Sequence, residues 1–247
     1  MNYKTSIIIF SIIISLSLFG EAHCGWLDNG KELLRGVSSH AIKKSDELSV
    51  SEIAGGLKDA LRVGTENVVK RLGTTNGFLK NRAVHIPLPE KLQKIKNTLN
   101  RIGMGSTLNN LETKLNRAAE IATPKAKKLF FNAISSMTID DVKRIYKGPE
   151  DAATQYFKKK MTLPLKKEMK PVIDESLNQV EAVRVYNSIL NKYNSLPFVT
   201  HVNGDIVDYT LNKTLDGIFY YLAKEEASIR KNPIKRTTAL LKKVFGR

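Results

Sequence analysis

The sequence of 247 residues has few of the residues on which most metal and cofactor sites depend. It contains one cysteine, Cys24, and four histidines. A single cysteine excludes an internal disulfide and a thiolate metal cluster. No two histidines stand at a zinc-binding spacing, and we find neither a glycine-rich phosphate loop nor a G-x-S-x-G elbow. We therefore expect no metal and no cofactor, and no residue is singled out as catalytic.

Long hydrophobic runs are also scarce, because only one occurs, at the N-terminus. Lys4 precedes 13 apolar or serine positions at residues 7–19, and "GEAHCGW" follows. A charged start, a short apolar core and a small-residue exit are typical of a secretory signal peptide. The run is shorter than the roughly 20 residues that a membrane-spanning helix needs. We predict a signal peptide at residues 1–24 and a periplasmic protein; an uncleaved anchor and a lipoprotein acylated on Cys24 are the alternatives.

Acidic residues are outnumbered, with 24 Asp and Glu against 40 Lys and Arg, which gives a net charge of +16. Such a protein attracts anions. The excess gathers in residues 156–171, with six Lys and one Glu, and in residues 229–247, with seven Lys or Arg and no acid. Both stretches either form a basic surface or are ordinary helices with one buried face. The candidates for a basic surface are Lys158, Lys159, Lys160, Lys166, Lys167, Lys242 and Lys243.

The charge alone does not select a partner. We expect an anionic lipid, an envelope polymer or a periplasmic protein, and the oligomeric state stays open. Nucleic acid is not expected, because aromatic residues make up only 7% of the chain and no nucleic-acid-binding motif is visible.

Helix start and stop signals occur in nearly every segment after Trp26. Ser49 with Glu52 and Thr138 with Asp141 match capping boxes, and Gly103 matches a helix stop. Proline is expected to start a helix at Pro124 and to start or interrupt helices at positions 164 and 171. Residues 172–194 and 206–231 each predict one long helix.

These signals predict an all-α protein with a single compact multi-helix domain over residues 48–247, after an N-terminal segment at 25–47. Two stretches, residues 83–88 ("AVHIPL") and 198–202 ("FVTHV"), have strand-like composition. They are candidates for one short two-stranded β ribbon, although "IPLP" also suits a simple extended connection stiffened by proline.

One predicted helix carries an unusual row of polar residues, in "NNLETKLNRAAE" at 109–120. Glu112, Asn116 and Glu120 recur every fourth residue at the border of an apolar stripe, and Arg117 can reach Glu120 three positions on. Half-buried polar groups need partners. The row is therefore either a structural network that joins this helix to another part of the chain or a cluster that faces a ligand.

Long stretches of the chain closely resemble the DUF4197 family of exported bacterial proteins of unknown function. They include "GLKDALRVGTENVVKRLGTTNGFLKN", "LETKLNRAAEIATPKAKKLFFNAISSMTIDDVKRIYKGPEDAATQYFKKK" and "LDGIFYYLAKEEASIRKNPIKRTTALLKKVFG". The resemblance implies a periplasmic, mostly helical domain over residues 48–247 and adds no activity or ligand. The matching stretches contain the polar residues that we expect in a binding site, if one exists: Glu112, Asn116, Arg117, Glu120, Asp216, Glu225, Glu226, Arg230 and Arg236.

The sequence thus favours a non-enzymatic periplasmic protein that binds an anionic envelope component or a partner protein through a basic surface. The alternative is an enzyme that acts on an envelope polymer, with Glu112 or Glu120 as general acid or base. That enzyme would require a cleft and a carboxylate with a raised pKa.

Overall fold

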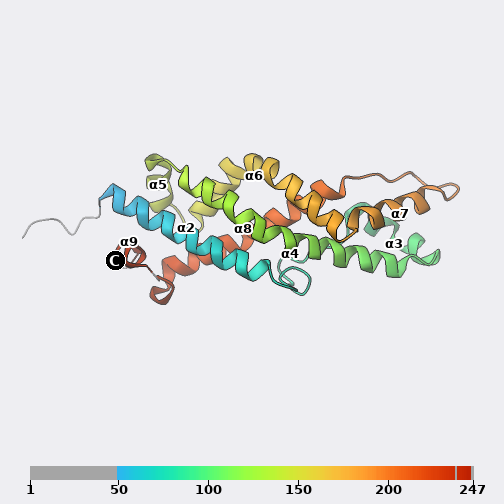
Figure 1. Ribbon diagram of the computed structural model, residues 1–247, viewed down its shortest axis with the longest axis horizontal. Helices are drawn as coiled ribbons and strands as arrows, with labels where there is room; N and C mark the ends of the chain where they lie inside the picture. The colour runs from blue at the N-terminus through green and yellow to red at the C-terminus, as the bar shows by residue number, and fades with distance from the viewer. Residues whose placement is uncertain (1–48, 237, 246–247) are drawn as a thin grey trace, which may run out of the picture. The chain divides into compact units, whose positions relative to one another are not determined.

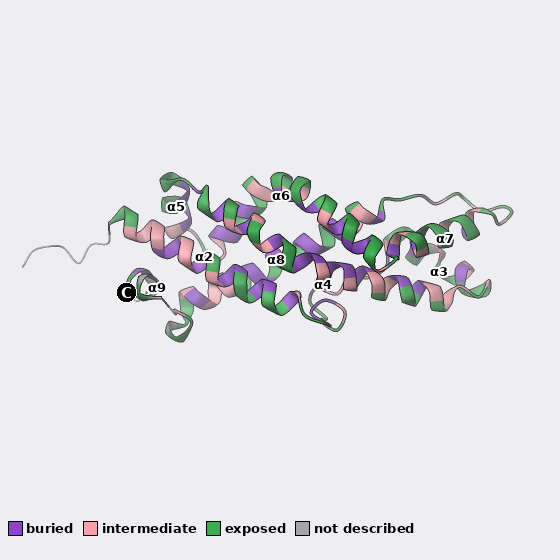
Figure 2. Cartoon of the chain, in the orientation of Figure 1, coloured by how far each residue is buried: buried purple, intermediate pink, exposed green. Residues whose placement is uncertain are grey.

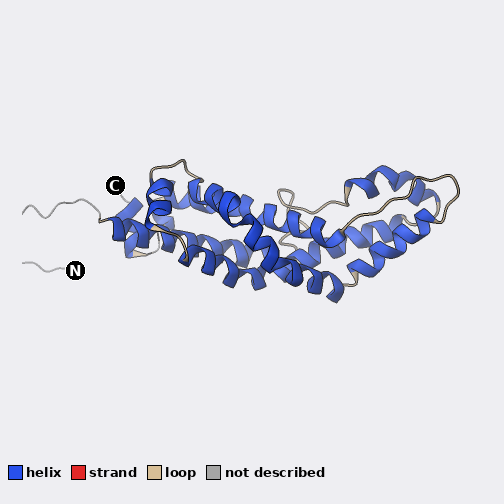
Figure 3. Ribbon diagram, turned by 90° about the horizontal axis from the view of Figure 1, so that it is seen from above, coloured by secondary structure: helices blue, strands red, loops and turns tan. Residues whose placement is uncertain are grey.

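The computed structural model describes residues 49–236 and 238–245, and the regular secondary structure of this part is entirely helical, with loops between the helices (Figures 1 and 3). The predicted signal peptide and residues 25–47 lie outside the described residues. The elements are α2 (Val50–Leu72), α3 (Glu90–Arg101), α4 (Gly105–Ser135), α5 (Ile139–Tyr146), α6 (Ala152–Gln179), α7 (Ala182–Asn194), α8 (Ile206–Lys231), a 3-10 turn (Pro233–Lys235) and α9 (Ala239–Phe245).

The all-α prediction is confirmed for the described residues, and the candidate β ribbon does not form there. Residues 83–88 and 198–202 adopt turns and irregular structure without a strand. Within the described residues, no helix is long and apolar enough to cross a membrane.

The core is built around α4, which packs against α2, α6, α7 and α8, while α6 also packs against α8. Leu111 and Leu115 of α4 are fully buried, as are the small residues Ala118, Ala122 and Ala126 (Figure 2). Small side chains on one face let neighbouring helices approach α4 closely. The apolar stripe predicted around residues 109–120 is therefore the buried face of the central helix.

Both predicted capping boxes are present. The Ser49 hydroxyl accepts the Glu52 N–H and Thr138 accepts the Asp141 N–H, while each carboxylate returns to its cap residue. Gly103 has a φ of 80°, in the left-handed region that favours glycine, between α3 and α4. The predictions of these helix ends from their capping residues are therefore confirmed.

The predictions based on proline were wrong, because the helices continue through it. Pro124 lies inside α4, and Pro164 and Pro171 lie inside α6. A proline removes one helical hydrogen bond, but tertiary packing of a long buried face can outweigh that loss. The Pro124 ring lies against Gly73, where a Cβ atom would come within 2.6 Å of Pro124 Cγ. The absence of a side chain at position 73 accommodates this proline.

The single helix predicted over residues 172–194 is two helices. Helix α6 ends at Gln179, and α7 begins at Ala182 after Glu181, which has a φ of 59°. The left-handed conformation of a non-glycine residue breaks the helix without glycine or proline at the break, so neither of the usual signals was available.

Candidate functional site

The polar row of α4 holds the segment that links α2 to α3. Glu120 is buried, and its Oε1 accepts the N–H groups of Phe78 and Leu79, each at 3.0 Å. Its Oε2 accepts from Arg117 at 2.6 Å, and Arg117 also donates to Asn76 at 3.1 Å. Both oxygens of Glu120 are therefore engaged within the protein.

The side chain of Asn116 makes the two hydrogen bonds to Ile86 that a neighbouring β-strand would make in a sheet. Its Oδ1 accepts the Ile86 N–H at 2.9 Å, and its Nδ2 donates to the Ile86 carbonyl at 2.8 Å. Nδ2 also donates to the Glu112 carbonyl at 2.8 Å. Ile86 and Asn116 are both 0% exposed. One amide group thus satisfies the main chain of a fully buried, non-helical residue, as buried backbone polar groups require.

Glu112 completes the network through His85. The His85 Nε2 lies 2.7 Å from Glu112 Oε1, and its Nδ1 lies 2.9 Å from the Leu79 carbonyl oxygen. Both ring nitrogens are therefore engaged within the protein. Glu112 and Glu120 are thus each paired with a basic side chain, and this arrangement gives the enzyme hypothesis no support.

A second buried carboxylate fixes the start of α6. Glu226 of α8 accepts the N–H groups of Ala153 and Thr154, both at 2.9 Å, and the Thr154 hydroxyl at 3.0 Å. Arg230 donates to Glu226 at 3.1 Å and to the Ile145 carbonyl, at the end of α5, at 3.0 Å. Burial raises the pKa of Glu226, although these hydrogen bonds oppose that rise. Glu226 and Arg230 therefore join α5, α6 and α8.

The remaining polar candidates near the C-terminus divide into two kinds. Arg236 donates to the carbonyls of Ile229 and Arg230 at 3.2 and 2.8 Å, at the end of α8, and Glu225 accepts from Asn67 of α2 at 3.2 Å. Asp216 differs, because it is exposed and has no hydrogen-bond or ion-pair partner in the described part of the chain. Among the described residues, it is the one polar candidate left without such a partner.

Asp216 lines a cavity of about 580 Å³, here called the α8 hollow. Helix α8 forms its floor, the start of α6 forms one wall, and residues 83–85 form the other. At Gly217 a Cβ would lie 2.8 Å from Phe78 Cε1 and 3.2 Å from Val84 Cβ, so glycine lets the 76–88 segment approach α8. Its polar lining includes Gln155, Lys158, Lys213, Asp216, Tyr220 and Lys224.

The two buried networks converge on this hollow. The α4 row holds the segment that carries one wall, and Glu226 holds the first turn of α6, which carries the other. The row and Glu226 therefore act as positioning residues for the walls rather than as ligand contacts.

A second cavity of about 630 Å³, here called the α5 hollow, lies between the end of α5 and the first turns of α6. Arg144, Lys158, Lys159 and Lys160 line it, and its lining residues, all described, include no acid. The nearby Asp141 carboxylate accepts hydrogen bonds from Arg144 at 2.7 Å and from the Tyr156 hydroxyl at 2.9 Å. Burial opposes ionisation of Asp141, but hydrogen bonds from Thr138, Tyr156 and Arg144 outweigh it and lower its pKa to about 2.

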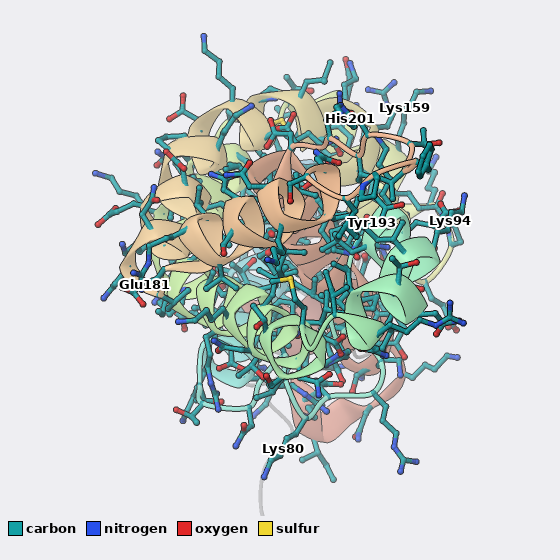
Figure 4. All side chains as sticks on the ribbon, turned by 90° about the vertical axis from the view of Figure 1, so that its right-hand side faces the viewer. Lys80, Lys94, Lys159, Glu181, Tyr193 and His201 are labelled. Carbon is teal, nitrogen blue, oxygen red and sulfur yellow. The ribbon has the colours of Figure 1, made fainter. Side chains whose placement is uncertain are left out.

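The two basic stretches lie on helices with different neighbours. Helix α6 packs against α4, α5, α7 and α8, whereas α9 packs against α2. Lys159 lies on the outside of the helices, unlike Tyr193, which lies among them (Figure 4). Lys166 and Lys167 follow Lys159 along α6, while Lys242 and Lys243 lie on α9, where Lys243 is bonded to Glu52.

Sequence reasoning missed several lining residues of the hollows. Lys213, Tyr220 and Lys224 stand with Asp216 at spacings of three and four along α8, which places them on one helix face. This spacing is visible in the sequence. Arg144 could not be found this way, because it reaches the α5 hollow from a different helix.

Comparison with known proteins identifies a family but no function. The model of the family described as "Protein of unknown function (DUF4197)" matches residues 47–246. No curated protein and no solved structure matches the chain. Among the described residues, no group of three or more His, Cys, Asp or Glu is placed to hold a metal ion.

Proposed function

The chain belongs to the DUF4197 family, and from the charge of its surface we propose that it is a non-enzymatic periplasmic protein that binds an anionic component of the cell envelope through the first half of α6. The observation that carries this proposal is the α5 hollow, which four basic side chains line without an acidic one. The predicted signal peptide supports the compartment.

The first five lysines of α6 remain available to a ligand. Within the described part of the chain, no ion pair is formed by these five residues: Lys158, Lys159, Lys160, Lys166 and Lys167. Consecutive helical residues point about 100° apart, so Lys158, Lys159 and Lys160 fan over more than half of the helix circumference. An extended anionic surface meets such a fan better than a single small anion does.

An exposed apolar residue favours a lipid surface as that component. Leu163 is 79% exposed and lies between Lys160 and Lys166 in the same helix. Interfacial helices combine lysines, which attract anionic headgroups, with apolar side chains that enter the acyl boundary. Each lysine near an anionic membrane contributes about 1 kcal/mol, and salt weakens this attraction.

The test is co-sedimentation of the protein, expressed as the full chain, with vesicles. We expect binding to vesicles of 30% phosphatidylglycerol in phosphatidylcholine at 50 mM salt, loss of binding at 500 mM salt, and no binding to phosphatidylcholine alone. Replacing Lys158, Lys159 and Lys160 by Gln should weaken binding at least tenfold.

The matched control removes the same charge elsewhere. Lys96, Lys128 and Lys192 are exposed lysines on α3, α4 and α7 without an ion pair in the described residues. Their triple Gln variant should bind anionic vesicles nearly as well as wild type. Equal losses in the two triple variants would show that net charge alone acts, and absence of binding at 50 mM salt would overturn the lipid proposal.

A further inference from the structure

We infer that the α8 hollow is a binding site for an acidic sugar, that is, a carbohydrate unit carrying a carboxylate or phosphate group. This site overlaps the lysine fan of the proposed function only at Lys158, and it shares only Lys158 and Gln155 with the α5 hollow. Its volume of about 580 Å³ lies within the range of about 300–1,000 Å³ that small-ligand sites occupy.

The hollow presents acceptors suited to hydroxyl groups. Asp216 lines it and has no hydrogen-bond or ion-pair partner among the described residues. Asp151 lines it beside Gln155, whose Nε2 donates to the Asp151 Oδ1 at 2.9 Å. An ionised carboxylate only accepts hydrogen bonds and has two oxygens, so it can hold adjacent hydroxyls of a sugar. A simple anion would leave these acceptors without donors, so the lining favours a ligand with hydroxyl donors as well as negative charge.

An aromatic ring with a cation beside it lies on the same face of α8. Tyr220 is 38% exposed, and the Lys224 Nζ lies 4.5 Å from the centre of its ring. The ring offers a flat apolar surface for the C–H face of a sugar, and its hydroxyl offers a polar edge. Lys224, Lys213 and Lys158 bring positive charge to the hollow for an acidic substituent.

The walls of the hollow are held before any ligand arrives. Glu226 fixes Ala153 and Thr154 at the start of α6, and Asn116 and Glu120 fix the segment that carries residues 83–85. Groups held in place by packing and hydrogen bonds lose little freedom on binding, which favours affinity. His85 also lines the hollow, but both of its ring nitrogens are engaged, so it contributes shape rather than proton transfer.

The experiment measures binding of three probes to the full-chain protein by ligand-detected NMR titration: glucuronate, glucose as its uncharged counterpart, and inorganic phosphate as an anion alone. We expect glucuronate to bind at least fivefold more tightly than either of the others. Lys224→Gln should lower glucuronate affinity towards that of glucose, and Tyr220→Ala should weaken binding of both sugars.

Asp216→Asn discriminates sharply between a sugar site and an anion site. If Asp216 accepts sugar hydroxyls, the variant binds glucuronate at least fivefold more weakly. If the hollow merely attracts anions, removal of a negative charge strengthens binding of glucuronate and phosphate. Glu168→Gln, which removes an exposed acid of α6 outside the lining, is the matched control and should change neither affinity.

Failure of this inference can be told apart from failure of the proposed function. Lys159→Gln with Lys160→Gln leaves the lining of the α8 hollow intact and should weaken vesicle binding without changing glucuronate binding. Asp216→Asn should leave vesicle binding unchanged. Absence of glucuronate binding at 10 mM, or tighter binding of glucuronate by Asp216→Asn, would overturn the sugar site whatever the vesicles show.

Discussion

The two basic stretches of this protein have similar composition but different surroundings. In the C-terminal stretch, Arg230 pairs with Glu226, Lys231 pairs with Glu150 at 2.6 Å, and Lys243 bonds to Glu52. In the α6 stretch, Lys170 pairs with Asp208 at 2.7 Å, whereas the five lysines before it form no ion pair in the described residues.

The difference shows that positive charge in a sequence is not by itself a binding surface. Much of the C-terminal charge joins α8 and α9 to the rest of the fold, whereas the α6 charge faces solvent. The partners that decide this are remote in sequence: Glu52 lies 191 residues from Lys243. Substitutions in the two regions should therefore affect different properties, stability in one and ligand binding in the other.

The largest effect is expected from Glu226→Ala. This change removes the acceptor of the Ala153 and Thr154 amides and the carboxylate that pairs with Arg230, whose side chain is 14% exposed. Breaking a buried charge pair typically costs about 3–5 kcal/mol. We expect a loss of that size in the free energy of unfolding, measured by urea denaturation.

The neighbouring carboxylate provides the control for this prediction. Glu225→Ala removes one hydrogen bond, from Asn67, at a half-buried position. It should cost about 1 kcal/mol or less. Similar losses in the two variants would contradict the role given to Glu226 as the anchor of α6.

The raised pKa of Glu226 adds a pH dependence with a defined sign. Below the ordinary value of 4.5 the carboxyl is protonated in both the folded and the unfolded chain, so it adds no pH dependence. Between 4.5 and the raised folded pKa, the unfolded chain ionises more readily, so stability falls as the pH rises. In Glu226→Gln this fall should be absent, and the variant should compare more favourably with wild type at pH 7 than at pH 4.

A smaller effect is expected from Arg236→Ala. Arg236 donates to two carbonyls at the end of α8, where helices leave such groups without intrahelical partners. We expect a loss of about 1–2 kcal/mol in unfolding free energy. Lys235→Ala, at the adjacent exposed position, should change it by less than about 0.5 kcal/mol. Comparison of their urea midpoints checks this, and equal midpoints would show that Arg236 does not cap α8.

The smallest effect on stability is expected from the variant with Gln at Lys158, Lys159 and Lys160. These side chains are exposed and unpaired in the described residues, so the unfolding free energy should stay within about 0.5 kcal/mol of wild type. The same variant should show the largest loss of vesicle binding. A strongly destabilised triple variant would show that the α6 lysines, like the C-terminal basic residues, contribute to stability.

The sequence allowed the helical class and many helix ends to be predicted, because caps and periodicity are local. It failed at Pro124, where burial of a long helix outweighs a local signal, and at Glu181, where a left-handed residue breaks the helix without glycine. The polar row on α4 could be recognised, and its alternative as a structural network matches the observed contacts. Its partners, Phe78, Leu79 and Ile86, could not be identified, since they present main-chain groups that no residue type marks.

The hollows depend on contacts that sequence patterns do not encode. The α8 hollow needs the 76–88 segment, the start of α6 and one face of α8 together, and Glu226 reaches Ala153 across 73 residues. Asp216 could be selected only because it lies in a stretch resembling the family. That no other described residue pairs with it became visible only in the structure.

The side chain of Asn116 has a consequence for solubility. Ile86 lies in "AVHIPL", a stretch with strand-like composition. Asn116 bonds to both main-chain groups of Ile86, so these groups are not available to pair with another chain. Unpaired strand edges are templates for aggregation. Replacing Asn116 by Leu would preserve bulk in the core but release that edge whenever the segment detaches. Asn116 thus keeps the main chain of Ile86 paired within the fold, in a protein whose described part contains no sheet.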